Sequence, residues 1–216
     1  MPPDRRIVER AFFQRHPLLV AYDLIGTVLR VQRDGADVSG RIVEVEAYGG
    51  PLDLASHSSR MQSALALLSG TPGCLYMYRS YGIHTMLNVI AHEPEGTGGI
   101  LIRALEPLAG LEEMRERRGG PEKVLGKGPG VLTRSFGLRL TDIGVDITTS
   151  REISLIDGPT PGQILASERI GITRGLSARW RLFLAGSSEV SAHRRGDFVI
   201  REELSLLLPP PGTVIV

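Results

Sequence analysis

The stretch RIVEVEAY, residues 41–48, alternates apolar and polar side chains, which is typical of a β-strand with one buried face. Its apolar face ends at Ala47, and its polar face carries Glu44, Glu46 and Tyr48. Two carboxylates beside a phenol, just before a Gly-Gly-Pro turn, favour either the wall of a site or an ordinary solvated strand face. The strand alone does not decide between these two interpretations.

Around this strand the chain alternates short apolar segments with turn residues. The Asp34-Gly35 turn predicts a hairpin with strand 25–32, and a second hairpin is expected from segments 74–79 and 83–91. Further strands are expected at 100–105, 146–156 and 181–185, and short helices at 7–24 (interrupted at Pro17), 61–68, 108–118 and 128–136. We therefore predict α+β class: a single compact domain over residues 1–216, with a mostly antiparallel sheet, flanking short helices and a protruding β-hairpin.

Composition excludes several classes of protein. The single cysteine rules out a disulfide within the chain and a cysteine cluster for zinc. No run of 18 apolar residues and no signal-like start are present, so we expect no membrane span and residence in the cytoplasm. The sequence lacks a phosphate-binding loop, HExxH and GxSxG, which argues against the commonest nucleotide-binding proteins, zinc proteases and α/β-hydrolases.

Basic residues are clustered although the net charge is only +1. Six arginines lie between positions 169 and 195 against one acidic residue, Glu189, and seven basic residues lie between positions 115 and 139. Each cluster is compatible with a polyanion-binding surface or with an ordinary solvated face.

Two further residues stand out. Arg103 lies in the middle of the apolar strand 100–105, and a buried guanidinium needs a carboxylate partner, for which Glu44 and Glu46 are candidates. Tyr81 lies at the tip of the second hairpin, where turns prefer small residues, so its ring either inserts into a partner or folds back on the body. A carboxylate, a guanidinium and several aromatic rings together suit a flat ligand acted on by a general base.

The order of these segments resembles one family. RIVEVEAY followed by GGPLDLASH, GCLYMYRSYGIHTMLNV and ILIRALEP is similar to the alkyladenine DNA glycosylases, the 3-methyladenine DNA glycosylases of the mammalian type that also occur in bacteria. FFQRHPLLVAYDLIGTVL, KGPGVLTRSFGL, SERIGIT and RWRLFLAGS extend the resemblance over almost the whole chain. Members of this family flip a damaged nucleotide out of double-stranded DNA and hydrolyse its N-glycosidic bond.

The resemblance implies a catalytic group of three residues. Glu46 would deprotonate the water that attacks C1′, Arg103 would position this water, and the backbone carbonyl of Ile172 would also hold it. Because a carboxylate must be ionised to accept a proton from water, we expect Arg103 to stabilise the negative charge of Glu46. No metal or cofactor is implied, and the partner would be double-stranded DNA containing damaged bases, bound by a monomer.

The resemblance also implies residues that bind the flipped nucleotide. Tyr48 and His57 would stack on one side of the base and Tyr78 on the other. Asn88 would exclude undamaged guanine through its 2-amino group, and Tyr81 would enter the minor groove and fill the vacated place. Electron-rich rings favour the cationic 3-methyladenine and 7-methylguanine, while neutral hypoxanthine and ethenoadenine would be further substrates.

Two departures from the family pattern bear on substrate range. His84 and Ile83 stand where some members carry tyrosine and methionine, and the segment after Ile172 is shorter than in mammalian members. Two other functions remain open. One is a bifunctional glycosylase/lyase that uses the amine of Pro2 or Lys127, and the other is a non-catalytic sensor of DNA damage.

Overall fold

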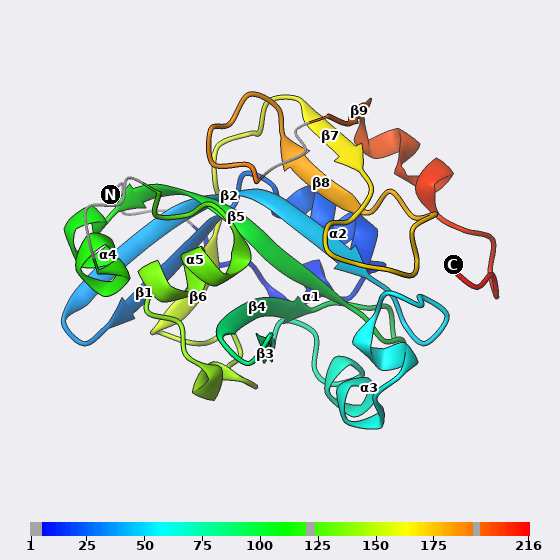
Figure 1. The fold of residues 1–216 in the computed structure, drawn as a ribbon, viewed down its shortest axis with the longest axis horizontal. Coiled ribbons are helices and arrows are strands. Elements are labelled where there is room, and N and C mark those ends of the chain that lie inside the picture. Colours follow the sequence, from blue (N-terminus) through cyan, green and yellow to red (C-terminus); the bar gives the residue numbers. More distant parts are fainter. Residues whose placement is uncertain (1–5, 120–123, 192–194) are drawn as a thin grey trace.

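The computed structural model describes residues 6–119, 124–191 and 195–216, and a nine-stranded sheet lies at its centre (Figure 1). The strands are β1 Val28–Arg33, β2 Ala36–Tyr48, β3 Leu75–Ser80, β4 His84–Ile90, β5 Gly99–Ala109, β6 Ile153–Ile156, β7 Ile164–Ser167, β8 Arg181–Leu184 and β9 Asp197–Val199. Their order is β3-β4-β5-β2-β8-β7-β9, and β1 pairs with both β2 and β6. Each of these strand pairs is antiparallel, which confirms the predicted fold class.

Short helices flank this sheet. They are α1 Arg10–Phe13, α2 Pro17–Leu24, α3 Gln62–Leu68, α4 Leu111–Arg118 and α5 Pro129–Ser135, with 3-10 turns η1 His57–Ser59, η2 Leu140–Asp142 and η3 Arg201–Leu207. The predicted break at Pro17 is confirmed, because this proline begins α2, where its missing N–H costs nothing. His16 caps this helix, accepting a hydrogen bond at Nδ1 from the backbone N–H of Leu18 at 3.1 Å.

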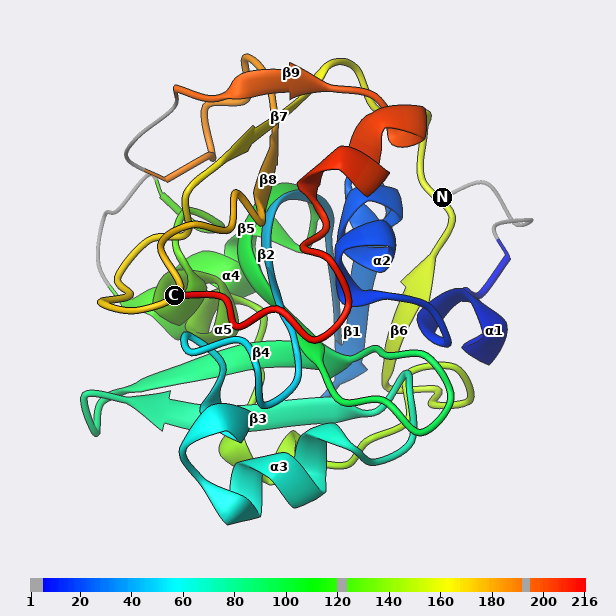
Figure 2. The same ribbon diagram turned by 90° about the vertical axis from the view of Figure 1, so that its right-hand side faces the viewer.

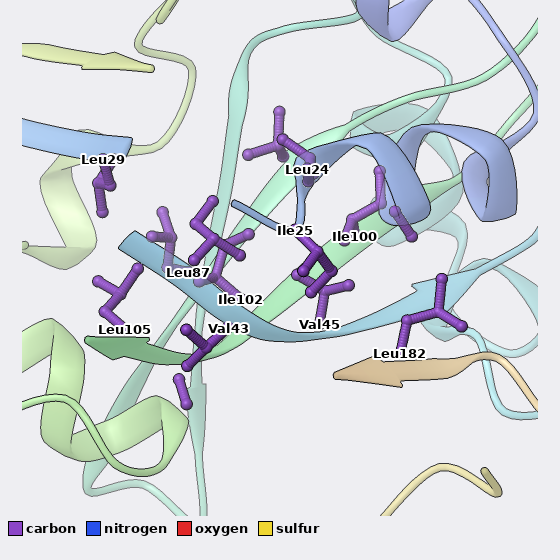
Figure 3. Close-up of a cluster of buried hydrophobic side chains, with 14 of the residues drawn as sticks. Leu24, Ile25, Leu29, Val43, Val45, Leu87, Ile100, Ile102, Leu105 and Leu182 are labelled. Atoms are coloured by element: carbon purple, nitrogen blue, oxygen red, sulfur yellow. The ribbon is translucent and has the colours of Figure 1, made fainter. Parts of the chain in front are cut away.

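The long strand β2 passes through the middle of the protein. Val43, Val45 and Ala47 are 0% exposed and pack into the main apolar core, together with side chains from α2, β1, β4, β5 and β8 (Figure 3). Glu44 and Glu46 on the opposite face are also 0% exposed. The interpretation of this strand as half-solvated is therefore wrong, because other parts of the chain cover both of its faces.

The pairing of β2 with β5 is irregular near the two carboxylates. The register runs from Ile42 opposite Leu105 to Glu44 opposite Ala104, and then to Val45 opposite Ile102, so it skips Arg103. Such bulges bend a strand locally and change the direction in which a side chain points. This bulge accompanies the approach of the Arg103 guanidinium to the glutamates of β2.

One predicted strand is only partly correct. The strand expected at 146–156 begins at Ile153, because Asp146 instead accepts hydrogen bonds from the backbone N–H and hydroxyl of Thr148 in a local turn. The strands β7 and β9 were not predicted, and both are short.

The segment before α5 packs closely against β5. Gly126 accepts a hydrogen bond from the backbone N–H of Leu105, and a Cβ atom on Gly126 would lie 1.7 Å from the carbonyl oxygen of Leu105. We therefore expect Gly126→Ala to lower the free energy of unfolding by about 3 kcal/mol, measured by denaturant titration. Gly162→Ala is the matched control, because its Cβ would meet its nearest atom only at 3.8 Å. Equal stability of the two variants would contradict this packing.

Candidate active site

A cavity of about 300 Å³ opens between η1, the β3–β4 hairpin, β5 and the segment 170–172. It is lined by Tyr48, Ala55, Ser56, His57, Arg60, Leu68, Tyr76, Tyr78, Ser80, Tyr81, Met86, Asn88, Gly99, Leu101, Arg103, Pro129, Ile170, Gly171 and Ile172. The volume and the aromatic lining suit a flat ligand about the size of a nucleobase. The site residues predicted from the sequence, apart from Glu46, lie on this wall.

Glu46 is fully buried directly behind the cavity wall. Its Oε2 accepts hydrogen bonds from the Tyr48 hydroxyl at 2.7 Å and from Arg103 Nη1 at 3.1 Å. Its Oε1 accepts a hydrogen bond from the backbone N–H of Ile170 at 2.7 Å. Three lining residues therefore hold this carboxylate in one orientation, and one of them supplies a positive charge.

A second buried carboxylate holds Arg103 from the other side. Glu44 Oε1 lies 3.3 Å from Arg103 Nε and 2.6 Å from Arg181 Nε. Glu44 also accepts hydrogen bonds from the backbone N–H of Ser191 at 2.8 Å and from its hydroxyl at 2.6 Å. The predicted carboxylate partners of Arg103 are thus confirmed, and the structure adds Arg181 and Ser191 to the group.

Burial and charge shift the pKa values of the groups around Glu46. Burial alone would lower the pKa of Arg103, but the attraction of Glu46 and Glu44 outweighs this effect, so the pKa lies above its ordinary value. Burial, and then the nearby Glu46, raise the pKa of Tyr48 well above its ordinary value. At neutral pH Arg103 is therefore charged, and Tyr48 keeps the proton that it donates to Glu46.

The aromatic side chains of the cavity form a connected group. His57 and Tyr78 meet edge to face, with ring centroids 4.5 Å apart and planes inclined by 71°, and His57 Nδ1 lies 3.0 Å from the Tyr76 hydroxyl. Burial raises the pKa of Tyr78 to about 12. The contact between His57 and Tyr78 joins η1 to β3 on the wall of the cavity.

Two other predicted residues also reach the cavity. Asn88 is buried on β4, and its Nδ2 donates a hydrogen bond to the backbone carbonyl of Tyr76 at 3.1 Å. This contact fixes the side-chain amide of Asn88 against the backbone of the neighbouring strand β3. Ile172 is half-buried, lines the cavity and lies two residues after Ile170, whose backbone N–H donates a hydrogen bond to Glu46.

The β3–β4 hairpin projects from the body (Figure 2). Tyr81 lies in its turn, directly after Ser80, which pairs with His84. The Tyr81 side chain is 89% exposed, which confirms the expected exposed aromatic tip and shows that the interpretation as a folded-back ring is wrong. Its backbone has a φ of +52°, a left-handed conformation that is uncommon for tyrosine. The hairpin therefore carries local strain at the residue that it presents to solvent.

The sequence did not indicate two charged residues that support this site. Arg169 and Asp53 form a fully buried, two-pronged ion pair with distances of 2.6 and 2.8 Å. Arg169 and Arg181 belong to the basic cluster at 169–195, which was interpreted as a polyanion-binding or solvated surface. Both arginines are buried, so this interpretation is wrong for them. The only sequence feature that pointed to Arg169 was the cluster of arginines, and the spacing of arginines does not show which of them are buried.

Neither amine proposed for a lyase mechanism is among the described residues that line the cavity. Lys127 Nζ lies 3.4 Å from the carbonyl of Ser188, whereas Pro2 lies outside the described residues. The cavity-lining residues that the structure describes include no lysine. Among all the residues that the structure describes, no group of three or more histidine, cysteine or acidic residues is arranged to bind a metal ion.

The helices of residues 6–119, 124–191 and 195–216 include none that is long and apolar enough to cross a membrane.

Comparison with known proteins identifies the family of this chain. Residues 11–188 match the family described as Methylpurine-DNA glycosylase (MPG). A Chlorobium luteolum protein is 40% identical over 191 residues, covering 86% of this chain and 96% of the relative, and a Burkholderia orbicola protein is 41% identical over 192 residues, covering 86% and 91%. Both are named "Putative 3-methyladenine DNA glycosylase".

The chain therefore belongs to the methylpurine-DNA glycosylase family. Within this family it is a hydrolase of the DNA-3-methyladenine glycosylase type, which acts on N-glycosyl bonds in DNA repair.

The geometry of the hairpin tip predicts how its stability responds to substitution. Tyr81→Asn should leave the free energy of unfolding unchanged or raise it by about 0.5–1 kcal/mol, because asparagine tolerates a left-handed φ and the lost ring is exposed. Thermal and urea unfolding measure this effect. Tyr76→Phe is a buried comparison within the same hairpin, where loss of the hydroxyl contact to His57 should destabilise the protein. A fall of more than 1 kcal/mol for Tyr81→Asn would show that the ring packs against the body.

Proposed function

We propose that this protein removes alkylated purines, chiefly 3-methyladenine and 7-methylguanine, from duplex DNA by hydrolysis. The observation that carries this proposal is a carboxylate, Glu46, held by Arg103, Tyr48 and the Ile170 N–H directly behind an aromatic cavity of nucleobase size. The cavity, the carboxylate and the exposed Tyr81 all come from one chain, which supports action as a monomer.

In the proposed reaction, Glu46 is the general base. It takes a proton from a water molecule, the water oxygen forms a bond to C1′, and the bond between C1′ and the base nitrogen breaks. The electron pair of the broken bond neutralises the cationic base, so no acid is needed for this leaving group. Arg103 and the carbonyl of Ile172 position the water, and Arg103 also donates a hydrogen bond to the Glu46 carboxylate at 3.1 Å.

The same cavity would hold the flipped base. Tyr48, His57 and Tyr78 provide aromatic surfaces, and a cationic base gains about 1–2 kcal/mol on such surfaces when water is excluded. Asn88 lines the cavity, and its proposed role is to oppose the 2-amino group of undamaged guanine. Hypoxanthine and ethenoadenine, which are neutral, would bind by stacking alone.

The hairpin tip would occupy the gap left in the duplex. Flipping a nucleotide costs a few kcal/mol, and an aromatic wedge between base pairs offsets part of this cost. The exposure of Tyr81 and its place on the rim of the cavity support this role. The alternative as a non-catalytic sensor gives no reason for the carboxylate and guanidinium behind the stacking surfaces.

The proposed base can be tested by substitution. Glu46→Gln should slow release of 7-methylguanine from methylated duplex DNA by about 10²–10⁴-fold, because glutamine cannot accept the proton of the water. The measurement is single-turnover release of free base, without added metal. Glu106→Gln is a matched control, because this glutamate lies on β5 but is partly exposed and pairs with Arg41.

The control variant should keep the wild-type rate. Equal rates for wild type and Glu46→Gln would show that another group activates the water. No release by wild type, together with tight binding of damaged duplex, would favour the sensor function.

His57 makes binding of a cationic base dependent on pH. Burial and then the charge of Arg60 lower the pKa of His57 below its ordinary 6.5, and its other close contacts are the neutral Tyr76 and Tyr78. The imidazole is therefore neutral at pH 7 and becomes charged only as the pH falls through its lowered pKa. A charged His57 would repel a cationic base.

We accordingly expect the Kd of the inactive Glu46→Gln protein for a 7-methylguanine duplex to rise about threefold between pH 7 and pH 5, and that of a hypoxanthine duplex to change less. Adding His57→Asn should remove the difference between the two duplexes. The same pH response with and without His57 would assign it to another group.

A further inference from the structure

A buried ion pair lies directly behind the stacking surface of Tyr48. The guanidinium carbon of Arg169 lies 4.8 Å from the centroid of the Tyr48 ring and 5.6 Å from that of Trp180. Arg169 is bound by both oxygens of Asp53, and neither side chain is exposed. Since Tyr48 lines the cavity and the guanidinium is wholly buried, Arg169 covers the face of the ring that is turned away from the cavity.

The pair is also tied to the backbone around the site. Arg169 Nη1 donates to the carbonyl of Ala47 at 3.1 Å, and Nη2 donates to the carbonyl of Gly175 at 2.9 Å. Asp53 accepts hydrogen bonds from the backbone N–H groups of Gly49 at 2.9 Å and Ala55 at 3.1 Å. Asp53 and Arg169 therefore have fixed positions relative to Tyr48.

This position gives the pair an electrostatic effect on the cavity. A base stacked on the open face of Tyr48 would lie about 8 Å from the guanidinium, allowing about 3.5 Å for the stacking distance. Two positive charges at this distance repel each other strongly in a partly buried site. Asp53 balances the charge of Arg169, so the wild-type wall presents a nearly neutral background to the base.

We propose that the Asp53–Arg169 pair sets the selectivity of the cavity between cationic and neutral damaged bases, by balancing the charge behind Tyr48. This inference rests on the proposed function, in which Tyr48 stacks on the flipped base. It makes Asp53 and Arg169 determinants of specificity that do not touch the substrate. A purely structural clamp would instead affect both classes of base equally.

The two members of the pair allow a test with opposite signs. Binding is measured at 10 °C with the Glu46→Gln protein, using duplexes that differ only in carrying 7-methylguanine, which is cationic, or hypoxanthine, which is neutral. Adding Asp53→Asn leaves the positive charge of Arg169 unbalanced. The preference for 7-methylguanine, measured as the Kd for the hypoxanthine duplex divided by the Kd for the 7-methylguanine duplex, should then fall about fivefold. Adding Arg169→Gln leaves a negative charge and should raise the preference by a similar factor.

Matched controls carry the same charge changes at an exposed ion pair. Asp37→Asn and Arg30→Gln alter the Arg30–Asp37 pair of the β1–β2 hairpin, away from the cavity, and should leave the ratio of the two Kd values unchanged. Circular dichroism first establishes that each variant is folded at 10 °C. Either single variant of the buried pair suffices, because the ratio is measured within one protein preparation.

Three results would overturn the inference: an unchanged ratio in both buried variants, a shift in the same direction in both, or loss of folding in both at 10 °C, which would make the pair a structural clamp. Failure of the proposed function is distinguishable from these results. In that event the protein with Glu46 intact would release no 7-methylguanine, whatever the binding ratios.

Discussion

Four buried side chains of alternating charge, in the order Arg181, Glu44, Arg103 and Glu46, run along one face of β2. Each carboxylate is also bound by backbone or hydroxyl donors, so no member of this group is an isolated buried charge. Loss of Arg103 would remove the positive charge that binds Glu46 in an environment of low dielectric constant. The arrangement therefore holds the Glu46 carboxylate in place at the cost of desolvating four ions.

The rest of the fold provides the partners that this group needs. The sheet places β5 on one side of β2 and β8 on the other, which brings Arg103 and Arg181 to the two glutamates. The loops that follow β7 and β8 then supply the Ile170 N–H and Ser191. A polar site on a sheet surrounded by apolar core is rigid, and the proposed general base needs this rigidity to stay within reach of one water molecule.

The two parts of the site that we propose to meet DNA differ in how they are held. The Glu46 carboxylate and Tyr48 are fixed by buried ion pairs and hydrogen bonds, whereas Tyr81 projects on a hairpin at a strained, exposed turn. A wedge of this kind can separate from or enter a duplex without disturbing the carboxylate behind the cavity. The part of the structure around Glu46 is thus held by many interactions, whereas the hairpin tip proposed to contact DNA is held by few and can adapt.

The sequence by itself determined the local features of this protein. Alternation in residues 41–48 identified the strand and its two glutamates, turn residues located both hairpins, and the charge of Arg103 within an apolar strand required a carboxylate partner. These features depend on neighbouring residues and on the cost of burying a charge, both of which are visible in a single segment. The resemblance to a family then predicted roles for residues that the fold brings to one cavity.

Only the tertiary structure decided which charged residues are buried and with what partners. Asp53 meets Arg169 across 116 positions of sequence, Glu46 meets the Ile170 N–H across 124, and Glu44 meets Ser191 across 147. A cluster of arginines has the same pattern in sequence whether its members face solvent or carboxylates, because the difference lies in distant segments that cover them. The burial of both faces of β2, the edge-to-face contact of His57 with Tyr78, and the ion pair behind Tyr48 all follow from this long-range packing.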